Sequence, residues 1–180
     1  SSAGTGSGGH QAAEFFRMGT GLEYRHVPYQ GGAPAVTATV KGEVDCIMQL
    51  SMEVTEMLRA KQLKALAVMD KDVLEVEGYG AIPAITDWLP DFPSVGNTFG
   101  FFIPKDIPAE ATEAITKSFK EAAASDAVKK FAVERGSKAV AIYGEEADTW
   151  MDVKASGVCW LLFESGVIKN SPDQYGIQKP

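Results

Sequence analysis

The chain has 180 residues, of which 45% are hydrophobic and 23% charged, a composition typical of a globular protein with a sizeable core. Its 17 Lys and Arg against 24 Asp and Glu give a formal charge of −7, which excludes a general electrostatic attraction to nucleic acid or to an anionic membrane. No apolar run approaches the roughly 20 residues of a membrane span, so direct membrane insertion is not expected. Two cysteines and two histidines are too few for a disulfide scaffold or a Cys- or His-rich metal site.

The chain opens with a run of small residues, mostly Gly and Ser, over 1–9. Such a run can be a linker or a disordered tail. It can also be a loop that follows a strand, because it leads directly into a helical pattern in which Ala12, Phe15 and Phe16 share one face. We favour the loop, and we expect Gly19-Thr20-Gly21 to end the helix.

Strand-like and helical segments then alternate. Strands are expected at 23–27, 44–48 and 64–69, and the helices between them should begin near Gly31 and at Ser51. With an opening strand assumed upstream, this order is typical of a mostly parallel sheet that is covered by helices.

The composition changes in the second half. Residues 70–97 are rich in Gly, Pro and Asp, and we interpret them as a surface excursion. A strand over 97–103 precedes two helices within 108–135, a strand at 138–142 and a long helix from 145. These helices present more apolar surface than one strand covers, so we expect them to pair with upstream residues or with a second copy of the chain. The side chains expected to be uncovered are Phe119, Phe131, Trp150, Leu161 and Leu162.

The Gly-rich run over 4–9 formally fits G-x-G-x-x-G, but a dinucleotide site also needs a preceding strand and an acid about 20 residues later. It is not a P-loop, because His10 stands where Lys is required. We expect His10 to pack or to hydrogen-bond rather than to act as a base. The run does offer backbone N–H groups and hydroxyls at a helix start, which suit a carboxylate or a phosphate. A plain loop with a helix cap is the alternative.

A second glycine pair, Gly31-Gly32 after Tyr29, repeats this arrangement at the next helix start. Ligands of open α/β sheets collect outside the carboxyl ends of the strands, so the two loops should converge on one cleft. Gln49 and Ser51 are further candidates at the third helix start. No acid–base pair, nucleophile or metal cluster stands out, so we expect capture of an anion without a cofactor.

Four segments together resemble the tripartite tricarboxylate transporter substrate-binding proteins, the Bug family. They are Val27-Pro28-Tyr29-Gln30-Gly31-Gly32-Ala33-Pro34-Ala35, Gly42-Glu43-Val44-Asp45, Leu63-Lys64-Ala65-Leu66-Ala67-Val68 and Phe99-Gly100-Phe101-Phe102-Ile103-Pro104. The resemblance implies an α/β, periplasmic-binding-protein-like (type II) two-lobed fold that is incomplete in this chain and lacks the family's N-terminal part.

The resemblance also implies an organisation. Residues 1–98 match the second lobe with its βα repeats and ligand loops, 99–103 a crossover strand, and 104–180 the returning helix-rich part of the first lobe. The residues expected to contact a ligand are Ser2, Thr5, Gly6, Ser7, Tyr29, Gly31 and Gly32 from the resemblance, with Gln49 and Ser51 from the helix start.

The function that the resemblance implies is that of a bacterial periplasmic or extracytoplasmic receptor without enzymatic activity. It would capture a carboxylated organic solute and deliver it to the membrane permease subunits of a tripartite tricarboxylate-type transporter. Gln30 and Gln49 stand where family members often carry Lys and an acidic or Asn residue, so the resemblance does not identify the solute. The alternatives are an α/β enzyme and a ligand-sensing regulatory domain that acts on a small organic anion.

Overall fold

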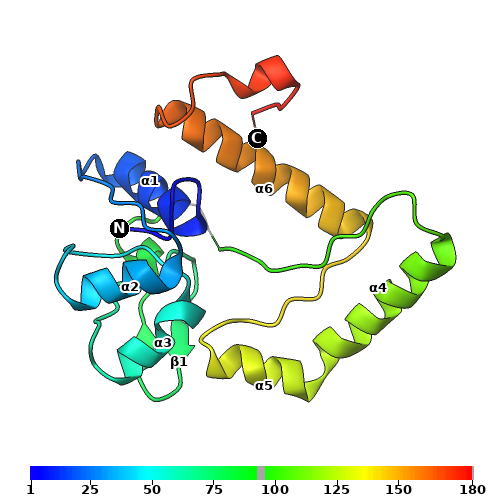
Figure 1. Cartoon of the computed structure of the whole chain (residues 1–180), viewed down its shortest axis with the longest axis horizontal. Helices are drawn as coiled ribbons and strands as arrows, with labels where there is room; N and C mark the ends of the chain where they lie inside the picture. The colour runs from blue at the N-terminus through cyan, green and yellow to red at the C-terminus, as the bar shows by residue number, and fades with distance from the viewer. Residues whose placement is uncertain (93–95, 180) are drawn as a thin grey trace.

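The computed structural model describes residues 1–92 and 96–179. Helices α1 to α3 gather around the N-terminus, α4 lies on the opposite side of the molecule with α5 between it and α3, and α6 runs from that side back to α1, against which it packs (Figure 1). No helix within the described residues has both the length and the apolarity that a membrane crossing requires. The α-helices are α1 Gly8–Thr20, α2 Gly32–Val40, α3 Ser51–Arg59, α4 Ala109–Ala124, α5 Asp126–Glu134 and α6 Glu145–Glu164.

The helix boundaries follow from local capping chemistry. The Ser7 side chain accepts a hydrogen bond from the His10 N–H at the start of α1, and Gly21 ends the helix in the left-handed conformation at φ 69°. Helix α3 begins at Ser51, with the Glu53 carboxylate in its first turn. The helices predicted from the sequence are therefore confirmed, and the long helix from 145 ends at Glu164.

The structure contains much less parallel pairing than the sequence predicts. None of the five expected strands, at 23–27, 44–48, 64–69, 97–103 and 138–142, forms a ladder. Only two parallel bridges occur in the described residues, Ser2 with Pro28 and Val68 with Ala84.

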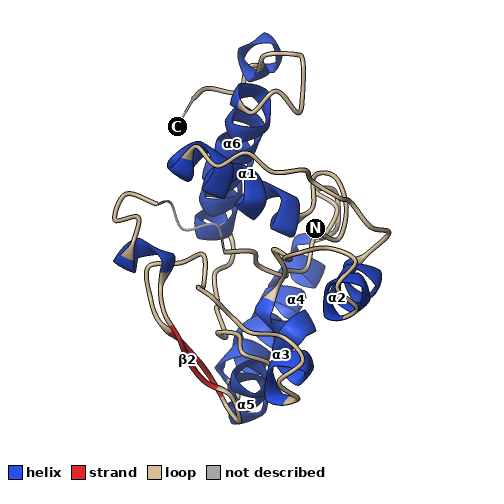
Figure 2. Ribbon diagram, turned by 90° about the vertical axis from the view of Figure 1, so that its left-hand side faces the viewer, coloured by secondary structure: helices blue, strands red, loops and turns tan. Residues whose placement is uncertain are grey.

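The interpretation of 70–97 as a surface excursion is also wrong, apart from 93–95, which lie outside the described residues. It contains the antiparallel hairpin of β1 Leu74–Val76 and β2 Gly80–Ile82 (Figure 2). Val76 and Ile82 pack with Leu58 of α3 in a core cluster, and Ile85 and Phe92 are buried as well. The Gly, Pro and Asp residues mark turns, and between them Val76, Ile82 and Ile85 point inward, whereas Val73 and Trp88 are exposed.

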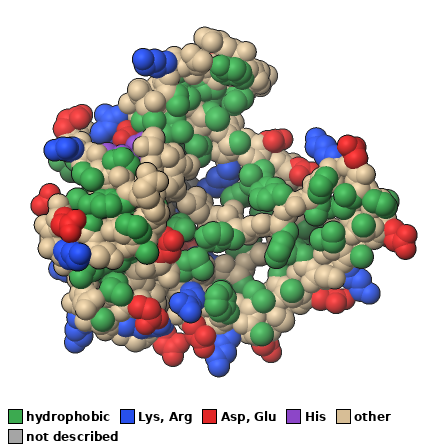
Figure 3. Space-filling view, viewed as in Figure 1, with side chains coloured by type: hydrophobic (Ala, Val, Ile, Leu, Met, Phe, Trp, Pro, Cys, Tyr) green, Lys and Arg blue, Asp and Glu red, His purple; other side chains and the backbone are tan. Residues whose placement is uncertain are grey.

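The second half contributes little to this core. No residue of α4 is buried, and Phe131 of α5 is 54% exposed. Phe119, Trp150 and Leu162 are half-buried, whereas Leu161 is buried. Hydrophobic side chains gather where α4 and α5 border the hollow centre of the molecule (Figure 3). Of the five named side chains only Phe131 is exposed, so the expectation of uncovered apolar faces is met at Phe131 and is wrong for Leu161, and the pairing of these faces with upstream residues or a second copy stays a prediction.

The C-terminal end of α5 is held by α3. The buried Thr55 hydroxyl, which lies 2.8 Å from the Ser51 carbonyl oxygen of its own helix, also lies within hydrogen-bond distance of the Arg135 carbonyl oxygen, at 3.2 Å. The Arg59 guanidinium donates to the carbonyl oxygens of Glu134 and of Glu77, each at 2.7 Å. Helix α3 therefore connects the hairpin to the second half of the chain.

The core cluster makes the stability of the first half depend on Leu58, which is 3% exposed. We expect Leu58→Ala to lower the free energy of unfolding by about 2–5 kcal/mol, because it removes buried methyl groups and leaves a cavity. The matched control is Leu66→Ala, at a side chain that is 70% exposed, which should change it by about 0.5 kcal/mol or less. Urea unfolding measures both, and equal losses would contradict this placement of the core.

Candidate functional site

The first loop (residues 2–7) and the second loop (residues 29–32) lie side by side. The Tyr29 N–H donates to the Ser2 carbonyl oxygen at 3.1 Å, and the Gly31 N–H donates to that of Ala3 at 2.9 Å. Each loop leads directly into a helix, α1 at Gly8 and α2 at Gly32. The structure thus brings together the two Gly-rich helix starts that the sequence singled out.

The third loop (residues 48–51) completes this surface. Its Met48 carbonyl oxygen packs so closely on Gly9 that a Cβ there would lie 2.0 Å away. The Gln49 side chain lies equally close to Gly32, with 2.2 Å between its Nε2 and the position of a Cβ. The N-termini of α1, α2 and α3 therefore meet at one edge of the molecule, where their N–H groups favour an anion.

The nine predicted contact residues differ in how far they are open to solvent. Thr5 and Gly6 are exposed, and the side chain of Ser2 is completely buried. The Ser2 hydroxyl donates to the Gly4 carbonyl oxygen at 3.1 Å and lies 2.8 Å from His26 Nε2. The buried Ser2 side chain therefore stabilises the conformation of the first loop. The remaining six are half-buried, and their role as ligand contacts stays a prediction: Ser7, Tyr29, Gly31, Gly32, Gln49 and Ser51.

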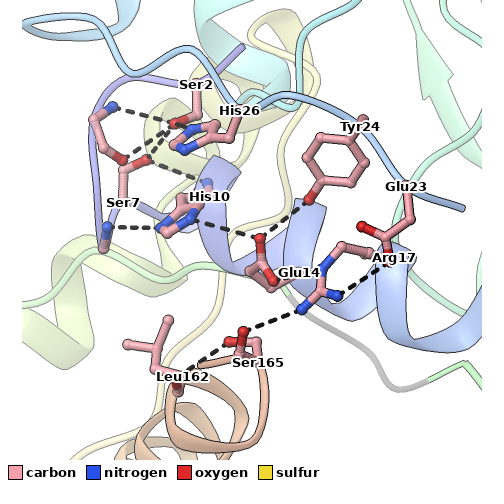
Figure 4. A network of polar contacts seen from close by, with 12 residues as sticks. Ser2, Ser7, His10, Glu14, Arg17, Glu23, Tyr24, His26, Leu162 and Ser165 are labelled. Carbon is pink, nitrogen blue, oxygen red and sulfur yellow. Dashed lines mark hydrogen bonds and ion pairs between the residues drawn. The ribbon is translucent and has the colours of Figure 1, made fainter. Parts of the chain in front are cut away.

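A stacked pair of histidines, buried His10 and half-buried His26, lies beside the first loop (Figure 4). His10 is 3% exposed, and its Nδ1 accepts a hydrogen bond from the Gly6 N–H at 3.0 Å. The ring stacks on that of His26, with 4.2 Å between the centroids and 9° between the planes. The expectation that His10 packs and hydrogen-bonds is confirmed, because it holds the turn of the loop.

The network continues from the histidines to α6. His10 Nε2 faces the buried Glu14 carboxylate at 3.7 Å. Glu14 accepts hydrogen bonds from Arg17 Nε at 3.0 Å and from the Tyr24 hydroxyl at 3.3 Å, and burial raises the pKa of Tyr24 so that the phenol keeps its proton. Arg17 also donates to the Ser165 carbonyl oxygen at the end of α6, at 3.2 Å (Figure 4).

Sequence reasoning missed four residues at this site. The spacing i, i+4 links His10 to Glu14 and Gln49 to Glu53, and could have identified both acids. His26 and Asn97 carry no such signal, because only the tertiary structure brings them to the first loop. The Asn97 amide reaches Gly8, where a Cβ would lie 1.5 Å from its Nδ2.

The chemistry that this arrangement supports is the binding of an anion. Exposed backbone and hydroxyl groups meet three helix N-termini, and within residues 1–92 and 96–179 no group of three or more His, Cys, Asp or Glu side chains is placed to hold a metal ion. The backbone donors and dipoles are fixed by the fold, so they require little rearrangement when an anion arrives.

Comparison with known sequences agrees with this arrangement. The profile described as tripartite tricarboxylate transporter family receptor (TctC) matches residues 1–153. The chain is 30% identical over 139 residues to the UPF0065 protein in the tcbD-tcbE intergenic region of Pseudomonas sp. (strain P51), covering 76% of this chain and 40% of that protein. It is 28% identical over 136 residues to Protein BugT of Bordetella pertussis, covering 75% and 41%. The chain thus spans about 40% of the length of these curated relatives.

Two solved structures have a similar fold. One is "R. palustris Rpa4515 with adipate", with a TM-score of 0.71, 24% identity, and coverage of 89% of this chain and 53% of that chain. The other, "Structure of a periplasmic transporter", has a TM-score of 0.73 and 23% identity, and covers 92% and 53%. These likenesses confirm the predicted α/β, periplasmic-binding-protein-like fold, of which the chain spans about half.

The histidine pair makes stability depend on pH. Burial, followed by the neighbouring His10 ring, lowers the pKa of His26 below its ordinary value of 6.5. The unfolded chain therefore binds more protons than the folded chain between the two pKa values, and we expect the free energy of unfolding to fall as pH drops below about 6.5. In His26→Gln this loss should be smaller. Urea unfolding from pH 7.5 to 5 checks it, and an unchanged slope in the variant would contradict the assignment.

Proposed function

This chain belongs to the tripartite tricarboxylate transporter receptor family, and we propose that it binds a carboxylated organic solute outside the cytoplasm and delivers it to a membrane permease. The observation that carries the proposal is the meeting of three helix N-termini at the first, second and third loops. The bound group would be a carboxylate held mainly by backbone N–H groups. The role is one of capture, without conversion of the solute.

The physical case rests on the helix ends. Each N-terminus stabilises an anion by about 0.3–1 kcal/mol, and by up to about 2 kcal/mol where it is partly buried. Exposed Thr5 and half-buried Ser7 add hydroxyl donors on the first loop. A carboxylate bound at these helix ends is therefore attracted by the backbone itself, without an arginine or lysine.

The relatives support a carboxylate as the solute class. One of the two solved structures with the same fold is that of Rpa4515 with adipate, a dicarboxylate, and the family is described as a receptor family of tricarboxylate transporters. For this chain the solute, the permease partner and the periplasmic location are parts of the proposal.

We also propose the lobe assignment given by the sequence: 1–98 in the ligand-loop lobe, 99–103 as the crossover, and 104–180 in the opposite lobe. It is supported by the core cluster, which lies entirely in the first of these segments. The rings of Phe101 and Phe102 in the crossover segment are exposed. This exposure is consistent with a lobe of which the chain contains only a part.

A calorimetric screen tests the function. Mono-, di- and tricarboxylates and acidic amino acids are titrated into the purified protein, and we expect saturable binding of some of them with no turnover. Turnover of any of these compounds would favour the alternative of an α/β enzyme, and failure of every one of them to bind would contradict the receptor proposal.

Gly6 tests whether the first loop takes part. Its φ of 79° lies in the left-handed region, so Gly6→Ala strains the backbone although nothing lies within 4 Å of the added Cβ. Gly21→Ala is the matched control, because Gly21 has φ 69° and equal space at the other end of α1. Each substitution should lower the free energy of unfolding by about 1–2 kcal/mol.

Only Gly6→Ala should weaken carboxylate binding, by about tenfold or more, because the strain displaces the N–H groups of the loop. Calorimetry on both variants measures this difference. Equal affinity in the two variants would remove the first loop from the site.

A further inference from the structure

A carboxylate of the chain itself lies at the second loop. The Gln49 Nε2 donates a hydrogen bond to Glu53 Oε2 at 2.5 Å, and both side chains lie over Gly32, the first residue of α2. A Cβ on Gly32 would lie 2.2 Å from Gln49 Nε2 and 2.7 Å from Glu53 Oε2. A side chain at position 32 would therefore push this amide–carboxylate pair away from the loop.

The pair remains open to solvent and has capacity left for a ligand. Glu53 is exposed and Gln49 is half-buried. Gln49 occupies Oε2, whereas Oε1 accepts no hydrogen bond from the part of the chain that the structure describes. The carboxylate also lies near two helix starts, α2 at Gly32 and its own helix α3, and both favour its negative charge at this place.

We infer that Glu53 determines which solutes the site accepts: a carboxylate at the first loop, joined to a cationic or neutral hydrogen-bond donor, such as an ammonium or a hydroxyl group, at the second loop. This inference rests on the proposed function. The solute class is then an amino acid or a hydroxy acid in preference to a plain dicarboxylate.

The reason is the sign of the charge at the second loop. An ammonium group that reaches Glu53 gains a charge-assisted hydrogen bond to its carboxylate. The second carboxylate of a dicarboxylate would stand beside a like charge at the same place, and would compete with Glu53 for the start of α2. The first loop lacks such an acid among its own residues 2–7, so it takes the carboxylate that both kinds of solute share.

The test compares solutes of equal length that differ at one end. The pairs are 4-aminobutyrate with succinate, 5-aminopentanoate with glutarate and 6-aminohexanoate with adipate, titrated calorimetrically into the protein. For the pair whose length fits the site, we expect tighter binding of the amino acid. Glu53→Gln keeps a hydrogen-bonding partner for Gln49 and removes the charge, so it should shift the ratio of the two dissociation constants toward the dicarboxylate by about tenfold.

The matched control is Glu43→Gln, which makes the same charge change at an exposed residue beyond the C-terminal end of α2, and it should leave the ratio unchanged. Thermal melting checks that both variants fold. Carboxylate binding with the same ratio in wild type and Glu53→Gln, or tighter binding of the dicarboxylate by wild type, overturns the inference and leaves the receptor proposal standing. Absence of binding by every carboxylate in all three proteins overturns the receptor proposal as well.

Discussion

The pairing of residues 1–3 with segments on both sides is the constraint on which the rest of the site depends. The Ser2 and Ala3 carbonyl oxygens accept hydrogen bonds from the second loop, and the Ser1 carbonyl oxygen accepts one from the Met48 N–H at 3.1 Å. This short central segment fixes where three helices begin. Because each helix start has N–H groups without intrahelical partners, placing the three starts together creates the anion-binding edge.

The polar network beneath the first loop makes this placement rigid. Ser2, His10 and Glu14 are buried, and among the described residues no buried side-chain nitrogen or oxygen lacks a hydrogen-bond partner. Burial of so many polar groups is tolerated only when each is satisfied, and the satisfied network then allows one arrangement of the loop. Its last contact, from Arg17 to Ser165, extends this order to α6.

Helix α3 joins the site to the second half of the chain. Its first turn carries Ser51 and Glu53 where the three helix starts meet, and Thr55 and Arg59 contact the end of α5. In a receptor whose lobes close on a solute, the same short helix would meet both the solute and the opposite lobe. The apolar faces of α4 and α5 add no buried cluster of comparable size in the described residues.

The sequence by itself determined the helices, the three Gly- or Ser-marked helix starts and the family, because capping, glycine turns and short motifs are local properties of the chain. Only the tertiary structure decided that Val76 and Ile82 of the hairpin enter the core, that the parallel pairing stops after single bridges and that Ser2 is buried. It also brought His26 and Asn97 to the first loop and Glu53 to Gly32. Those outcomes depend on which distant surfaces pack together, and the spacing of residues along the chain does not encode that information locally.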